Sequence, residues 1–427
     1  MASHNPDIYL LYEYLDKISF TLKLQYQLDE PVDPALLNEA AQEAIVRFPY
    51  YRVQVGLDAG QNYTLEPNER PLAVLPEEDR RRVLGSDEVN GHLFFISYRG
   101  NSIWFNGSHS FSGSYGLLFW IKATLYLYMT RKYGAIEAPK DLKLPGTPVD
   151  DRELFFPDVD SVSKDEPLMR YEGGDCNFAI GRMLKFLFNP FAKDNYYYEI
   201  EIPAKEFMDY AVSIDGSPNT VLTAMMFKAM TRWLKEKKGT FVSGRTAADY
   251  RKDIGAEGSY RDFVRLIHTK YEWSMRDESI QQLNLRARGA MIKQNQPELG
   301  CERFLKLMEV HKSIDELPTL KEKKKYALAN STFRSDPRDV YSISYVGRVD
   351  YGGLADHIRG IYTITDGDLM LEVNATEDTF YITYQLINKD RKPLDRFLEV
   401  LGEEGIPYRV SERKVRYLPK IQLPEPR

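Results

Sequence analysis

Segments with strand-like and helix-like residue patterns alternate along this chain, and the alternation favours a mixed α/β fold. Residues 18–28 (ISFTLKLQYQL) alternate apolar and polar side chains, which predicts a half-buried strand. Asp33 and Pro34 then supply the N-cap and first position of a helix with an apolar stripe. Pro49 ends that helix, and residues 51–55 predict the next strand.

The same kinds of segment continue to the end of the chain. Residues 93–98 and 102–105 predict a hairpin that turns at residues 99–101. Residues 117–133 predict a buried helix that ends at Gly134. After a Pro-, Asp- and Gly-rich connection over 136–195, the predicted strands are 196–202, 341–345, 369–374 and 380–386, and the predicted helices are 217–236, 281–293 and 394–405.

The length of the chain predicts two lobes. Single hydrophobic cores stop growing at about 250 residues, and this chain has 427. We assign residues 1–185 to an N-terminal lobe, with the crossover beginning at about residue 136, and residues 186–427 to a C-terminal lobe. The second lobe repeats the first in kind, because each combines strands with helices.

Composition excludes several classes of protein. A net charge of −6 argues against a general nucleic-acid binder, which needs clustered positive charge. Cys176 and Cys301 are too few for a disulfide framework, and no cysteine or histidine spacing indicates a metal site. The most apolar stretch, residues 116–129, contains Lys122 and is too short to span a bilayer. With no secretory leader in the sequence, we expect a cytoplasmic protein.

One histidine lies in a setting that suits chemistry. In NGSHSFSGSYG, residues 106–116, His109 follows a predicted strand and precedes a buried helix. The Gly and Ser residues around it take up little room, so a ligand can approach the backbone and a ring nitrogen. Neutral imidazole is also the commonest general base near neutral pH. The alternative is a structural histidine that is hydrogen-bonded at the end of a strand.

The segment SHSFSGSYG resembles the HxxxDG motif of a known acyltransferase superfamily. That superfamily contains chloramphenicol acetyltransferase, the condensation domains of peptide synthetases and the bacterial alcohol-acetyltransferase-like group. His109 matches the motif histidine and Gly116 its final glycine. Gly113 stands in place of the motif aspartate and Ser114 in place of its first glycine. Ser108 stands where condensation domains carry a first histidine.

Four further blocks resemble the alcohol-acetyltransferase-like group and occur in the group's order. They are residues 30–55, residues 217–233, the DYRKDIG and SYRDF segments within 249–263, and YSISYVGRVDYGG at 341–353. The resemblance implies a fold of the α+β sandwich type, in which two similar lobes pack as a V around a central channel. An acyl thioester would enter this channel from one face and an acceptor from the other.

The resemblance also implies roles for residues in the channel. His109 would be the general base, and we expect its other ring nitrogen to bond a backbone carbonyl that fixes the tautomer. The backbone N–H groups of Gly113 and Ser114 are candidate donors to the oxyanion. The hydroxyl groups of Ser344 and Tyr345, on a late predicted strand, are alternatives, and ordinary strand packing would explain them equally.

The missing aspartate needs a replacement. In the family this residue pairs with an arginine and holds the site together, which Gly113 cannot do. Either the arginine has changed as well or another acid takes over the pairing, because an unpaired buried charge is costly. Arg251 and Arg348 are candidates for that arginine, or are ordinary structural residues.

Three functions remain open from the sequence. The first is acyl transfer from acyl-CoA or from a carrier-protein pantetheine to a small-molecule alcohol or amine, with no permanently bound cofactor. The second is a family member that binds a ligand or partner without catalysis. The third is a stand-alone condensation domain that acts on substrates held by an acyl or peptidyl carrier protein. The pseudo-dimeric length favours a monomer.

Overall fold

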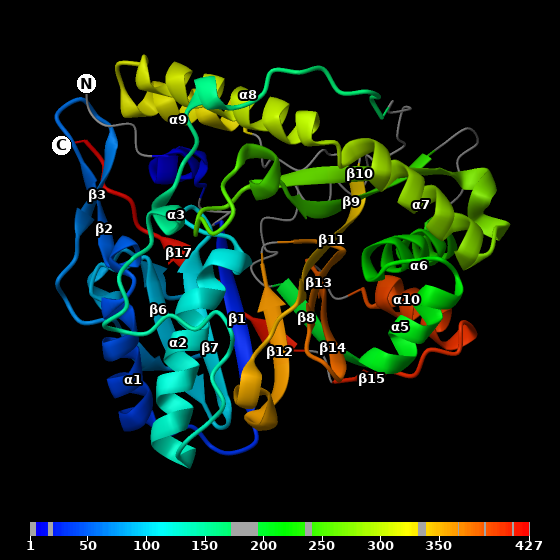
Figure 1. The fold of residues 1–427 in the computed structure, drawn as a ribbon, viewed down its shortest axis with the longest axis horizontal. Coiled ribbons are helices and arrows are strands. Elements are labelled where there is room, and N and C mark those ends of the chain that lie inside the picture. Colours follow the sequence, from blue (N-terminus) through cyan, green and yellow to red (C-terminus); the bar gives the residue numbers. More distant parts are fainter. Residues whose placement is uncertain are drawn as a thin grey trace.

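The computed structural model forms two main sheets, each with its own hydrophobic core and its own helices (Figure 1). The structure describes residues 6–15, 20–171, 195–234, 241–331, 339–365, 367–387, 390–411 and 414–426. The mixed α/β class is confirmed. The predicted lobe boundary near residue 185 and Cys176 lie outside the described residues, and the V-shaped packing of two lobes stays a prediction.

The first sheet is built mainly from the N-terminal part of the chain. Its strands are β1 (Thr21–Leu28), β4 (Val74–Pro76), β6 (Phe94–Arg99), β7 (Ser102–Ser108) and β12 (Ile358–Ile364). They lie in the order β12-β1-β7-β6-β4. Two helices, α1 (Pro34–Val46) and α2 (Ser114–Tyr133), pack against each other and supply buried residues to the same core. Figure 1 shows both helices along one side of this sheet.

The second sheet is built from the later part of the chain, in the order β10-β9-β11-β13-β14-β8-β15, with β16 also beside β8. The strands are β8 (Asn195–Pro203), β9 (Phe241–Asp249), β10 (Val264–Glu272), β11 (Asp339–Arg348), β13 (Met370–Ala375), β14 (Thr379–Leu386), β15 (Arg409–Val410) and β16 (Lys414–Arg416). The helices that contribute to its core are α5 (Ala204–Ser213), α6 (Pro218–Trp233), α7 (Ile280–Gln294) and α10 (Lys392–Glu403).

The late part of the chain returns to the first sheet. β12 pairs antiparallel with β1, with Lys23 opposite Ile364. A short strand near the C-terminus, β17 (Lys420–Ile421), pairs with β5 (Val83–Leu84) in a separate two-stranded sheet. The first sheet is therefore completed by residues that lie more than 300 positions further along the chain.

A third group of elements packs separately. The 3-10 helix η1 (Pro6–Glu13) contacts α9 (Leu320–Ala329), and α9 contacts α8 (Pro297–Asp315). Figure 1 shows α8 and α9 along the top of the view. The remaining short elements are η2 (Pro49–Tyr51), β2 (Val53–Leu57), β3 (Tyr63–Pro67), η3 (Asp87–Val89), α3 (Asp151–Leu154), η4 (Val159–Ser161), η5 (Arg251–Ile254), η6 (Trp273–Asp277) and η7 (Gly352–His357).

Local sequence signals account for many of these elements. The Asp33 carboxylate accepts hydrogen bonds from the N–H groups of Ala35 at 2.9 Å and Leu36 at 3.1 Å, which confirms the predicted cap of α1. The predicted hairpin and the predicted buried helix are β6–β7 and α2. The strand predicted at 51–55 begins only at Val53, because Pro49 starts a turn of 3-10 helix. Within the described ranges, no helix is both long and apolar enough to cross a bilayer.

Candidate functional site

The turn between β7 and α2 holds His109 at the end of the first sheet. β7 ends at Ser108 and α2 begins at Ser114, with Gly113 as its N-cap. The backbone N–H of His109 donates a 2.6 Å hydrogen bond to the carbonyl of Phe20, just before β1. This bond fixes the backbone while the imidazole stays 30% exposed. The histidine is therefore held firmly and is still open to a ligand.

A segment from the other half of the chain docks on this turn. The Ser112 hydroxyl donates a 2.7 Å hydrogen bond to the carbonyl of Tyr260. A Cβ atom on Gly116 would lie 2.0 Å from the same carbonyl oxygen, which is far closer than van der Waals contact allows. The glycine that matches the end of the motif is thus required by close approach of two backbones. Residues 259–263, between η5 and β10, reach the base of α2 in this way.

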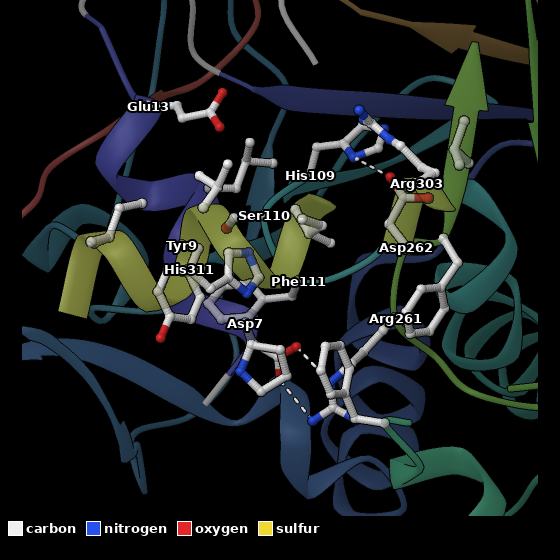
Figure 2. Close-up of a pocket in the computed structure, with 18 of the residues that line it drawn as sticks. Asp7, Tyr9, Glu13, His109, Ser110, Phe111, Arg261, Asp262, Arg303 and His311 are labelled. Atoms are coloured by element: carbon white, nitrogen blue, oxygen red, sulfur yellow. Dashed lines mark hydrogen bonds and ion pairs between the residues drawn. The ribbon is translucent and has the colours of Figure 1, made fainter. Parts of the chain in front are cut away.

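Asp262 of that segment points at the histidine (Figure 2). Its Oδ2 atom lies 3.4 Å from His109 Nδ1, and its side chain is 8% exposed. A Cβ atom on Gly113 would lie 2.7 Å from Asp262 Oδ1. The Asp262 carboxylate therefore fills the room that a side chain at position 113 would occupy. The structure places a carboxylate beside Nδ1, where we expected a backbone carbonyl.

The neighbours of Asp262 are firmly tied. Arg261 donates two hydrogen bonds to the buried carboxylate of Asp7 in η1, at 2.8 Å and 3.1 Å. The Tyr260 hydroxyl donates to the same carboxylate. The Tyr260 ring stacks on Tyr50 with ring centroids 4.1 Å apart. The backbone on the N-terminal side of Asp262 is therefore fixed by contacts that do not involve its own side chain.

Arg251 supports the same segment. It is buried, pairs with Asp249 and donates to the backbone carbonyls of Ser259 and Arg261. Arg251 therefore lies near Asp262 in the fold, but its guanidinium donates its hydrogen bonds to other groups. Arg348 is exposed at the end of β11.

A pocket that is open to solvent lies beside His109. Figure 2 shows 18 of its lining residues, and most of the wall comes from η1, α8, the motif turn and the segment of Asp262. The apolar part of the wall includes Leu10, Phe111, Phe156, Phe263, Leu307, Val310 and Ile314. The wall also includes Arg303 and Glu13, and burial lowers the pKa of Arg303 and raises that of Glu13 to about 7. The exposed area of the wall is mostly apolar, as in small-molecule sites, but five of its lining side chains are charged, namely Asp7, Glu13, Arg261, Asp262 and Arg303.

The other predicted site residues are divided between two places. Gly113 and Ser114 lie at the N-terminal end of α2, where the first backbone N–H groups have no partner within the helix. Ser344 and Tyr345 lie on β11 in the second sheet and are not among the residues that line the His109 pocket. Ser344 hydrogen-bonds the buried Glu372, and the Tyr345 ring lies 5.8 Å from the Phe380 ring.

Sequence reasoning missed Asp262, Arg303 and the wall supplied by η1. Asp262 belongs to the SYRDF segment, which the resemblance singles out as a block, but nothing in that block indicates which residue approaches the histidine. For metals, the described residues contain no group of three or more His, Cys, Asp or Glu side chains placed to hold an ion.

Solved structures with the same fold cover nearly the whole chain. TRI101 of F. sporotrichioides, solved with coenzyme A and T-2, is 11% identical with a TM-score of 0.57, over 96% of this chain and 99% of that one. The first condensation domain of the CDA synthetase is 12% identical with a TM-score of 0.55, over 92% and 93%. Polyketide synthase associated protein 5 of Mycobacterium tuberculosis is 10% identical with a TM-score of 0.52, over 93% and 95%.

Sequence comparison alone finds less. No protein-family model and no curated protein sequence matches the chain. At 10–12% identity the structural likeness shows the fold, and it does so across both sheets. The chain therefore has the fold shared by the chloramphenicol acetyltransferase-like acyltransferases and the condensation domains of peptide synthetases.

Proposed function

We propose that the protein transfers an acyl group from a thioester to an alcohol or amine, with His109 as the general base. The observation that carries the proposal is the position of His109. Its partly exposed imidazole follows β7, at the wall of a pocket, in a fold shared with acyltransferases. Imidazole at such a place can accept a proton near neutral pH.

The proposed reaction needs one proton to move twice. Nε2 of His109 takes the proton of the acceptor O–H or N–H while the acceptor atom bonds to the thioester carbonyl carbon. The resulting oxyanion collapses and the carbon–sulfur bond breaks. The thiolate leaves and receives the proton back from the imidazolium. Candidate donors to the oxyanion are the N–H groups of Gly113 and Ser114, because free N–H groups at a helix N-terminus favour negative charge.

Two thioester donors suit the fold. TRI101 was solved with coenzyme A, and a condensation domain shares the fold with it. In our proposal the donor is acyl-CoA, with a carrier-bound pantetheine as the alternative, and the acceptor occupies the pocket beside His109. The mainly apolar wall of this pocket favours an acceptor with an apolar body and one reacting hydroxyl or amine.

The test is release of free thiol from acetyl-CoA and longer acyl-CoA with a panel of alcohols and amines. We expect His109→Ala to lower acceptor-dependent release by about 10²- to 10⁴-fold, the usual contribution of a general base. The matched control is His268→Ala. His268 is 31% exposed and its Nδ1 lies 3.3 Å from Asp339, so it forms a similar pair away from the pocket. We expect this control to keep wild-type rates.

The other outcomes are equally informative. Equal rates for wild type and His109→Ala would remove His109 as the base. Release from carrier-bound thioesters alone would make the protein a condensation domain. A rise in melting temperature with acyl-CoA, but no release with any acceptor or carrier, would favour a binding protein and contradict the proposal.

A further inference from the structure

We infer that Asp262 is the positioning residue of His109 and that its carboxylate takes, from the second half of the chain, the space that Gly113 leaves open. The inference rests on the proposed function of His109. It adds that the base and the acid that orients it come from different parts of the fold. His109 follows β7 in the first sheet, and Asp262 lies just before β10 in the second.

Position 113 has no room for a side chain while the Asp262 carboxylate is in place. A Cβ atom on Gly113 would lie 2.7 Å from Oδ1, 3.1 Å from Cγ and 3.6 Å from Oδ2 of Asp262. The whole carboxyl group therefore borders the place where a side chain at position 113 would begin. A residue other than glycine at 113 would push this carboxylate away from His109. The Asp262 carboxylate can therefore lie beside His109 only because residue 113 has no side chain.

The carboxylate of Asp262 is also buried. Both carboxylate oxygens are buried, and neither accepts a hydrogen bond from any residue in the described ranges. A carboxylate buried without donors is unfavourable. Among the described residues, its nearest ionisable partner is Nδ1 of His109, at 3.4 Å, and Arg303 contributes a positive charge from α8. Figure 2 shows the Asp262 carboxylate directed at the imidazole, with Arg303 alongside.

The distance between Asp262 Oδ2 and His109 Nδ1 indicates whether a hydrogen bond is formed. At 3.4 Å the pair is longer than a formed N–H···O hydrogen bond, which spans 2.7–3.2 Å. Once shortened to that range, the bond keeps the proton on Nδ1 and leaves the lone pair of Nε2 for the acceptor. The same carboxylate then stabilises the imidazolium that forms when Nε2 takes the proton.

A purely structural role for this carboxylate is disfavoured by its surroundings. The segment is held by the Ser112 hydroxyl on the Tyr260 carbonyl and by Arg261 on Asp7. Asp262 contributes no hydrogen bond to that framework within the described residues. Its removal should therefore leave the segment in place. We expect Asp262→Ala to stay folded with this segment in place.

The activity test moves the carboxylate back to the motif position. We expect Asp262→Ala to lower kcat by about 10²- to 10⁴-fold with little change in KM, as for the loss of an acid that orients a catalytic histidine. Gly113→Asp alone should also be impaired, because two carboxyl groups then compete for one space. The double variant Gly113→Asp with Asp262→Gly should recover at least tenfold over Asp262→Ala. The matched control, Asp339→Ala, removes the acid of the His268 pair and should keep wild-type kcat.

A second measurement does not depend on activity. In spectra of protein with ¹⁵N-labelled histidine, the His109 signals are assigned by their loss in His109→Ala. We expect neutral His109 to carry its proton on Nδ1 in the wild type and to lose that preference in Asp262→Ala. An unchanged tautomer in Asp262→Ala would overturn the inference even if the protein is an acyltransferase. A tautomer that responds to Asp262, in a protein that transfers no acyl group, would instead overturn the proposed function alone.

Discussion

Replacing Gly116 by alanine tests whether the docking of residues 259–263 on the motif turn is as tight as the structure indicates. The new Cβ would lie 2.0 Å from the Tyr260 carbonyl oxygen and 2.2 Å from Ser112 Oγ. A backbone oxygen at 2.0 Å has to retreat about 1.4 Å to reach ordinary contact at 3.4 Å. That movement also breaks the hydrogen bond from Ser112 to Tyr260.

The cost can be assembled from these contacts. Overpacking costs about 1–3 kcal/mol, and the broken hydrogen bond adds about 1 kcal/mol. The higher helix propensity of alanine offsets up to about 1 kcal/mol of this loss of stability. The net loss is about 1–4 kcal/mol, which corresponds to a fall in melting temperature of about 1–4 °C, because an unfolding entropy of about 2.1 cal/mol/K for each of the 427 residues gives about 1 °C per kcal/mol. Acyl transfer should fall as well, because Asp262 moves with Tyr260.

The assay is differential scanning calorimetry of two variants that carry the same chemical change. Gly289 lies inside α7, and a Cβ atom added there would meet no atom within 4 Å. Gly289→Ala should therefore raise stability by about 0.5–1 kcal/mol. The two substitutions are expected to shift the melting temperature in opposite directions. A Gly116→Ala protein that melts with or above the wild type would refute the close approach.

Three further predictions concern buried charges and a helix cap. Burial raises the pKa of the Glu372 carboxyl to about 7 from its ordinary value of 4.5, so its ionisation destabilises the fold progressively as the pH rises from about 4.5 through 7. We expect the unfolding free energy of Glu372→Gln to exceed that of the wild type by up to roughly 3 kcal/mol in thermal melts at pH 8, and by much less at pH 4. Arg47 and Glu153 form a 2.6 Å ion pair with each side chain 3% exposed; Glu153→Ala should cost about 3–5 kcal/mol in denaturant titrations, and the double replacement with Arg47→Met should cost less. Asp33→Ala removes the cap of α1 and should lower stability by about 1 kcal/mol, whereas Asp33→Ser should keep most of it.

Features set by neighbouring residues could be predicted from the sequence. Asp33 caps α1 and Ser217 caps α6, since a cap needs only a hydroxyl or carboxylate within three residues of the N–H groups it accepts from. The hairpin of β6 and β7 follows from alternation and a glycine turn. His109 was found in the same way, because the turn of small residues and the buried helix are contiguous with it.

Features set by distant residues could not be predicted. β12 joins the first sheet through pairing with β1, and no local pattern in 358–364 indicates which sheet it enters. β9, whose sequence is FVSGRTAAD, carries glycine, alanine and charge, so its strand signal is weak. Asp262 is one of many acidic residues in the chain, and only the tertiary approach of residues 259–263 distinguishes it. The replacement for the missing aspartate therefore had to come from the structure.

The late arrival of β12 has a consequence for synthesis on the ribosome. β1 is complete at Leu28 and pairs with β7 on one side, but its partner on the other side, β12, begins only at Ile358. At about 5–20 residues per second, β1 waits roughly 15–70 s with one edge unpaired. An exposed strand edge is a site for pairing with another chain. Nascent chains stalled before residue 358 should therefore aggregate or bind chaperones, and those released after about residue 390 should do so much less. Because β12 is the last strand to be added to this sheet, the first half of the protein depends on translation reaching the second.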